Sequence, residues 1–78
     1  MNLAELPVGQ HATILQISGE GALRRRLLDM GLTPKTRITV RKVAPMGDPI
    51  ELAVRGYVLT LRLEEAGRIQ IQELDEEE

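Results

Sequence analysis

Hydrophobic and polar residues follow one another in short stretches, and glycine or proline separates most of these stretches. Residues 12–17, ATILQI, are mostly apolar and stop at Ser18-Gly19, a pattern typical of a buried or half-buried strand. Strand-like alternation recurs in four later stretches, residues 36–43, 50–54, 57–63 and 68–74. The pattern therefore predicts five short strands, with at most one helical turn at residues 64–67.

Two breaks in this pattern predict connections. Arg55-Gly56 predicts a tight turn into the strand 57–63, which places four apolar side chains on one face, Tyr57, Leu59, Leu61 and Leu63. Val43 is out of phase with the preceding alternation, which indicates a bulge near residues 41–43. Residues 44–49, APMGDP, form a loop that two prolines bracket.

Residues 21–30 follow a helical period instead. Leu23, Leu27 and Met30 fall on one apolar stripe when successive side chains are placed about 100° apart. Gly31 supplies a common helix end. We therefore expect a short helix between the first and second strands.

Three consecutive arginines, residues 24–26, fan around this helix, because neighbouring side chains point in different directions. Two of them have acidic residues at helical spacing, Arg25 with Asp29 and Arg24 with Glu20. Exposed pairs of this kind contribute only about 0.3–0.5 kcal/mol each, but they dilute the positive potential. The arginines are therefore not an isolated basic patch.

Leu28 lies away from the apolar stripe of the helix. Two interpretations remain open: the nearby GLTP segment and the 44–49 loop cover it, or it faces a binding partner. Its position makes it the main candidate for an interface on the helix.

Together these elements predict a mainly β fold, a small SH3-like barrel of about five strands with one α-helix inserted at about residues 21–30. A strongly bent sheet of short strands commonly closes in this way, which limits its exposed edges. We expect one domain at residues 1–74, because 78 residues are too few for a second core. Residues 75–78 are expected to be a disordered acidic tail.

The net charge of −2 comes from the end of the chain, where Glu73 and residues 75–78 supply five of the twelve acidic side chains. The chain has no cysteine, which suits a reducing compartment. Its first ten residues have neither a basic start nor an apolar run, and no later stretch approaches the roughly 18 apolar residues of a membrane span. We expect a cytoplasmic protein that does not insert into a membrane.

Composition excludes several kinds of chemistry. His11 is the only histidine, so we expect no bound metal and no other cofactor. The SGEG segment at residues 18–21 lacks the Lys-Ser/Thr ending of a phosphate-binding loop. A barrel this small is filled by its own side chains and leaves no room for a catalytic pocket. We therefore expect a protein that is not an enzyme.

The scarcity of aromatic residues excludes two further functions. Tyr57 is the only aromatic side chain. Single-stranded nucleic acids are bound by aromatic stacking platforms, and proline-rich peptides by aromatic-lined grooves. The remaining function class is a protein-interaction module, because Arg and Met are both enriched at interfaces.

The motifs of this sequence and their order resemble those of the FeoA family, the small cytoplasmic proteins of ferrous iron uptake. The arginine-bearing helix runs into Met30-Gly31-Leu32 and Pro34, and the AP-x-GDP loop follows at residues 44–49. The RGY-x-L-x-LR hairpin and the LPVGQHATI segment near the start of the chain complete the likeness. Nearly the whole chain outside the acidic tail takes part.

This resemblance implies an SH3-like barrel and a role beside FeoB, the membrane iron permease, as a regulator or assembly partner of Fe²⁺ transport. We expect the protein to dock on the cytoplasmic portion of FeoB. The residues of this hypothesis are Arg24, Arg25, Leu28, Met46, Gly47, Asp48 and Tyr57. Association with further copies of the chain remains possible.

Two alternatives remain. The same barrel resembles the C-terminal domain of DtxR-type iron-dependent repressors, and a free-standing domain could contact such a repressor. Nucleic acid is not an expected partner, because the chain has no room for a winged-helix domain. The second alternative is direct Fe²⁺ binding, which the shortage of metal ligands in the sequence disfavours.

Overall fold

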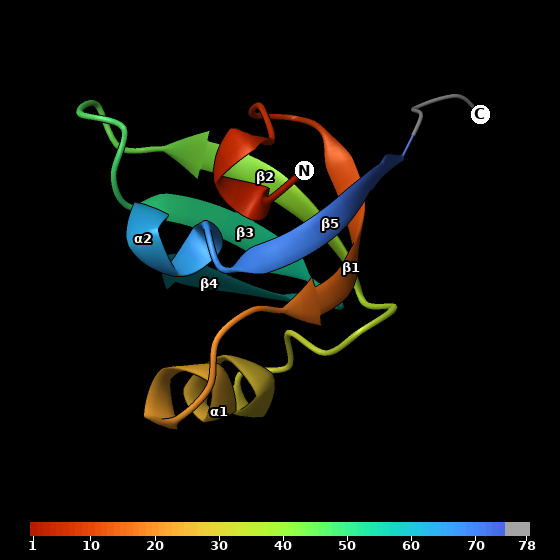
Figure 1. Cartoon of the computed structure of the whole chain (residues 1–78). Coiled ribbons are helices and arrows are strands. Elements are labelled where there is room, and N and C mark those ends of the chain that lie inside the picture. Colours follow the sequence, from red (N-terminus) through yellow and green to blue (C-terminus); the bar gives the residue numbers. More distant parts are fainter. Residues whose placement is uncertain (75–78) are drawn as a thin grey trace.

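Among residues 1–74, five strands form one antiparallel sheet in the order β4-β3-β2-β1-β5. The structure is a computed structural model and describes residues 1–74, so the tail predicted at residues 75–78 lies outside the described residues. The strands are β1 His11–Ile17, β2 Arg37–Val43, β3 Ile50–Val54, β4 Tyr57–Leu61 and β5 Ile69–Leu74. The sheet curls around a central core (Figure 1), which confirms the predicted SH3-like barrel.

In the described part of the chain, three short helices accompany the sheet: η1 Leu3–Glu5, α1 Ala22–Asp29 and α2 Leu63–Ala66. The inserted helix α1 begins after Gly21 and ends at Met30, which confirms the helix predicted at about residues 21–30. It lies at one end of the molecule, below the sheet in Figure 1. The 3₁₀ helix η1 was not predicted, because three residues are too few to show a period.

Alternating side chains build the core. In β3, Ile50, Leu52 and Val54 are buried while the two residues between them are partly exposed, as the sequence pattern predicts. Leu27 of α1 is fully buried, and Leu23 and Met30 pack against the same core. The predicted apolar stripe therefore fastens α1 to the barrel.

Two irregularities bend the sheet. The β2–β3 pairing shifts register between Val40 and Lys42, which confirms the bulge predicted near residues 41–43. A second shift lies in the β1–β5 pairing, between Ile14 and Gln16. An extra residue in one strand increases its local bend and twist, and this helps a five-stranded sheet to curl into a barrel.

The predicted end of the fourth strand is wrong. Leu63 was expected on the apolar face of a strand 57–63, but β4 stops at Leu61 and Leu63 begins α2. The carboxylate of Asp48 accepts a hydrogen bond from the Leu63 backbone N–H at 2.9 Å. This contact from a distant loop favours a helix start over another strand residue, and no local alternation can reveal it.

Candidate interaction surface

The helix α1 is held at several points. Its arginines take different directions, as the helical period predicts: Arg24 Nε donates to the Ile17 carbonyl at 3.3 Å, and Arg26 pairs with Glu65 of α2. The side chain of Arg25 makes no hydrogen bond or ion pair with residues 1–74. Two arginines therefore help to hold the helix in place, and Arg25 is the one available to a partner.

The acidic neighbours predicted for these arginines do not pair with them. Within the described part of the chain, neither Arg25 with Asp29 nor Arg24 with Glu20 forms an ion pair. The Nε atom of Arg24 instead reaches a backbone carbonyl at the end of β1, and tertiary contacts of this kind override weak pairs along a helix.

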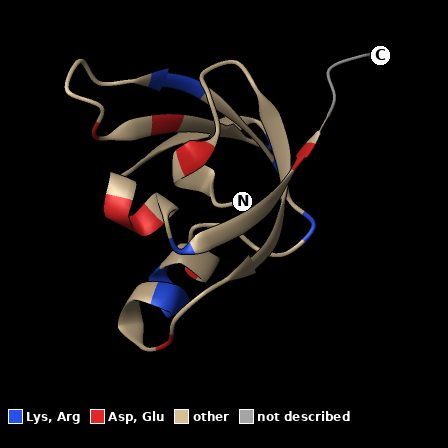
Figure 2. Ribbon diagram, turned by 45° about the horizontal axis from the view of Figure 1, so that its top comes forward, with Lys and Arg blue, Asp and Glu red and all other residues tan. Residues whose placement is uncertain are grey.

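Leu28 was expected either to be covered by the GLTP segment and the 44–49 loop or to face a partner, and the structure describes only its burial. It is partly buried and packs against the core, and its remaining surface lines a shallow hollow with Arg24 and Arg25. The loop 44–49 does not provide its cover, because α1 and the tip of that loop lie at opposite ends of the molecule (Figures 1 and 2). Three of the predicted site residues therefore share one surface.

Tyr57 joins β4 to the end of α1. Its hydroxyl donates a hydrogen bond to the Met30 carbonyl at 2.6 Å. Next to it, Gly31 has a φ of +97°, and a Cβ there would overlap the Tyr57 hydroxyl. The single aromatic residue therefore closes the helix C-terminus, although its side chain remains 43% exposed.

The remaining predicted site residues lie at the other end of the barrel. Met46 is 92% exposed at the tip of the 44–49 loop. The Gly47 N–H donates to the Ala44 carbonyl at 2.7 Å, which closes the turn below Met46. Asp48 caps α2. The predicted set thus divides between the α1 surface, defined as Arg24, Arg25 and Leu28 with Tyr57 at its border, and this loop.

Replacing Asp48 with alanine should lower the free energy of unfolding by about 0.5–1 kcal/mol. The Leu63 N–H then loses its carboxylate acceptor, and because this N–H is exposed, water replaces the acceptor. Chemical denaturation would measure this loss. Asp48→Asn keeps a side-chain oxygen and is the matched control, for which we expect less than half of the effect. Equal losses in the two variants would contradict the capping role.

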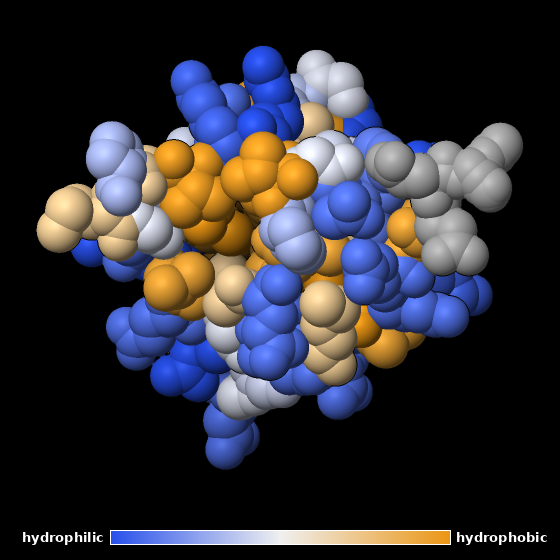
Figure 3. All heavy atoms as spheres, turned by 90° about the horizontal axis from the view of Figure 1, so that it is seen from above, coloured by the Kyte–Doolittle hydropathy of each residue, from blue (hydrophilic) through white to orange (hydrophobic). Residues whose placement is uncertain are grey.

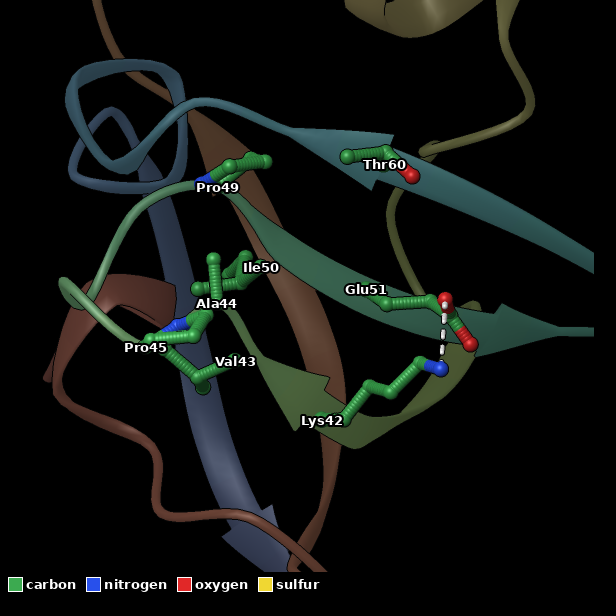
Figure 4. A pocket seen from close by; sticks show the side chains of 8 residues that line it. All are labelled: Lys42, Val43, Ala44, Pro45, Pro49, Ile50, Glu51 and Thr60. Atoms are coloured by element: carbon green, nitrogen blue, oxygen red, sulfur yellow. Dashed lines mark ion pairs between the residues drawn. The ribbon is translucent and has the colours of Figure 1, made fainter.

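A groove of about 330 Å³ lies beside the same loop, between the end of β2 and the start of β3 (Figure 4). Its apolar part comes from Val43, Ala44, Pro45, Pro49 and Ile50. At its rim, Glu51 lies 3.6 Å from Arg41 and 4.0 Å from Lys42. Seen from above, hydrophobic residues gather around a hollow on this end of the molecule (Figure 3).

Charges are also distributed unevenly. Basic residues occur on α1 and β2, and acidic residues mark α2 (Figure 2). Among residues 1–74, no three His, Cys, Asp or Glu side chains come together in a way that could hold a metal ion. In the same part of the chain, no helix has the length and hydrophobicity needed to cross a membrane.

Sequence and structure comparisons find close relatives. The chain is 38% identical over 72 residues to the Fe(2+) transport protein A/Fe(2+) transporter FeoB fusion protein of Porphyromonas gingivalis. The match covers 92% of this chain but only 8% of the fusion protein. The solution structure of a FeoA-like protein from Clostridium acetobutylicum matches with a TM-score of 0.91 and 38% identity, and it covers 100% of this chain and 91% of that one.

More distant structures share the fold. A Stenotrophomonas maltophilia FeoA complexed with zinc, described as a procaryotic SH3 domain protein, has a TM-score of 0.82 and 26% identity, covering 92% of this chain and 89% of that one. A manganese-dependent transcriptional repressor has a TM-score of 0.87, but at 21% identity and 36% of its own length this likeness shows the fold alone. The FeoA domain family matches residues 1–73, and with the relatives above it shows that the chain belongs to the FeoA family.

Proposed function

We propose that the protein is a non-catalytic, cytoplasmic accessory of ferrous iron uptake that binds the cytoplasmic portion of a FeoB-type permease and regulates it or helps to assemble it. One observation carries this proposal: a relative 38% identical to the chain combines the FeoA and FeoB parts in one polypeptide. A covalent link holds two modules at a high effective concentration, which favours a contact between them. The separate chain would make the same contact between two molecules.

The α1 surface is the part of the molecule that we propose to dock. The side chain of Arg25 is exposed and has no partner among the described residues, and Leu28 beside it is only partly covered. An apolar side chain next to an unpaired arginine suits a partner surface with an apolar centre and acidic rim. The 44–49 loop, which carries the exposed Met46, lies at the opposite end of the molecule from α1 (Figure 1), so we do not include it in this contact.

Binding to the purified cytoplasmic portion of the FeoB-type permease from the same organism tests this assignment. We expect Leu28→Asp and Arg25→Glu each to weaken binding by about tenfold or more in titration calorimetry, because one buries a charge and the other reverses one. Met46→Asp is the matched control and should bind within about twofold of the wild type. Thermal unfolding checks that each variant is folded.

The outcomes separate the surface from the function. Undiminished binding by both α1 variants would overturn the docking surface and leave the association intact. No binding by the wild-type chain would overturn the association itself. An anaerobic Fe²⁺ titration of the chain alone addresses direct iron binding, and saturable heat at micromolar Fe²⁺ would favour that alternative.

A further inference from the structure

The two borders of the sheet are protected differently. At the β5 border, the N-terminal segment lies alongside the strand: Asn2 bridges Gln70, and the Ile71 N–H donates to the Met1 carbonyl at 2.9 Å. This border also carries the charge of Glu73. At the other border, β4 pairs with β3 alone among the described strands, and its sequence YVLTL has no charge and no proline. Natural sheets usually block such an edge.

The register of the β3–β4 hairpin defines what this edge offers. Val54 and Tyr57 flank a two-residue turn and pair directly, so hydrogen-bonded residues then alternate along the hairpin. By this alternation the N–H and C=O groups of Val58 and Thr60 point away from β3. No hydrogen bond within residues 1–74 uses these four backbone groups. They form a template for one more strand.

There is room for such a strand near the end of β4. A groove of about 430 Å³ lies between the edge and α1, with Thr60 and Leu61 on one side and Arg26 on the other. Arg62 also lines it, and Glu65 at its border is paired with Arg26. A cleft between an edge strand and a helix accepts extended peptides by strand addition, in which backbone hydrogen bonds provide affinity.

The charges at the two ends of β4 indicate which kind of strand can pair with its free edge. Arg55 and Arg62 are exposed just before and just after β4, and neither forms an ion pair with residues 1–74. A second copy paired antiparallel about Leu59 would place Arg62 of each copy beside Arg55 of the other. The like charges of these arginines would repel each other at both ends of the paired strands. An extended segment with an uncharged middle and acidic flanks meets both arginines favourably.

We propose that the free edge of β4 binds an extended segment of the partner protein, uncharged over about four residues and flanked by carboxylates, as an added strand of the sheet. The inference rests on the proposed function for the identity of the partner, and it adds the mode of recognition. The α1 surface then neighbours this groove in the same docking region, since Arg26 lines both the groove and the hollow that Arg24, Arg25 and Leu28 line.

Amide hydrogen exchange of the ¹⁵N-labelled full chain tests the proposal, with the cytoplasmic portion of the FeoB-type permease as the probe. On binding, exchange at Val58 and Thr60 should slow by about tenfold or more, because their N–H groups become hydrogen-bonded. Exchange at Glu73, whose N–H points away from β1 on the other border by the same alternation, should change by less than about twofold.

Proline variants give an independent readout in calorimetry. Thr60→Pro removes one outward N–H and should weaken binding by about tenfold, whereas Thr60→Val keeps it and should bind within about threefold of the wild type. Glu73→Pro is the matched proline control on the other border.

Arg62→Gln tests the contribution of charge. It should weaken binding and reduce the dependence of binding on salt.

Binding without slower exchange at Val58 and Thr60, together with full affinity of Thr60→Pro, would overturn the strand-addition mode and leave the association standing. Failure of the wild-type chain to bind would overturn both proposals. The exchange measurement uses the wild type, so its result does not depend on whether Thr60→Pro folds.

Discussion

Replacing Leu27 with alanine should lower the free energy of unfolding by about 2–5 kcal/mol. Leu27 is fully buried, and it is the only residue of α1 that is. Alanine would leave a cavity between the helix and the barrel that neither element can fill without moving. Denaturant titration followed by circular dichroism would measure the loss. A domain of this size is stabilised by only about 5–15 kcal/mol, so the variant should be close to the limit of stability at physiological temperature.

Leu28→Ala on the same helix is the matched control for this experiment. Leu28 is only partly buried, so the same deletion should cost about 1 kcal/mol. A ratio near one between the two losses would contradict the orientation of α1 described above. It would mean that both leucines are equally buried.

Replacing Gly31 with alanine should cost about 1.5–2.5 kcal/mol, for two separate reasons. Its φ of +97° is unfavourable for any residue with a side chain, and the added Cβ would overlap the Tyr57 hydroxyl. Gly56→Ala separates these reasons, because Gly56 has a φ of +88° and no neighbouring atom within 4 Å of the place where its Cβ would lie. It should cost about 1 kcal/mol, the strain alone.

A second substitution tests the contact with Tyr57 directly. Tyr57→Phe in the wild type removes the hydrogen bond to the Met30 carbonyl and should cost about 0.5–1.5 kcal/mol. In the Gly31→Ala background the same change also removes the overlapping atom, so it should cost less or stabilise the protein. Additive effects of the two changes would contradict the packing of this hydroxyl against Gly31.

Local patterns were sufficient to predict most of the secondary structure. The period of Leu23, Leu27 and Met30 located α1 because burial on one side of a helix repeats every three to four residues. Alternation located β3 for the corresponding reason, and the phase error at Val43 revealed a bulge. These signals come from neighbours along the chain, and tertiary contacts here agree with them.

Contacts between distant segments account for what the pattern missed. Leu63 starts a helix where Asp48, fifteen residues earlier, supplies an acceptor for its N–H. The predicted docking set joined Met46 with Arg25 because both are exposed, chemically suitable and part of family motifs. The helix α1 precedes β2 and the 44–49 loop follows it, however, so the two lie at opposite ends of this strand (Figure 1). Recognition by α1 and by the loop cannot be distinguished without this topology.

The edge of β4 shows a similar limit. The hairpin at Arg55-Gly56 already implies which backbone groups of Val58 and Thr60 point outward. Only the sheet order, however, establishes that β4 lies at a border and that the N-terminal segment covers the opposite one. The sequence could therefore supply the orientation of these groups but not their availability.

Uptake of radioactive Fe²⁺ by cells of the source organism tests the central claim, the role of this chain as a FeoB accessory. We expect deletion of its gene to lower uptake severalfold, a plasmid copy of the chain to restore it, and the same deletion to have no further effect in cells that lack the FeoB-type permease. Unchanged uptake in the single deletion, or an equal additional loss in cells without the permease, would contradict the account.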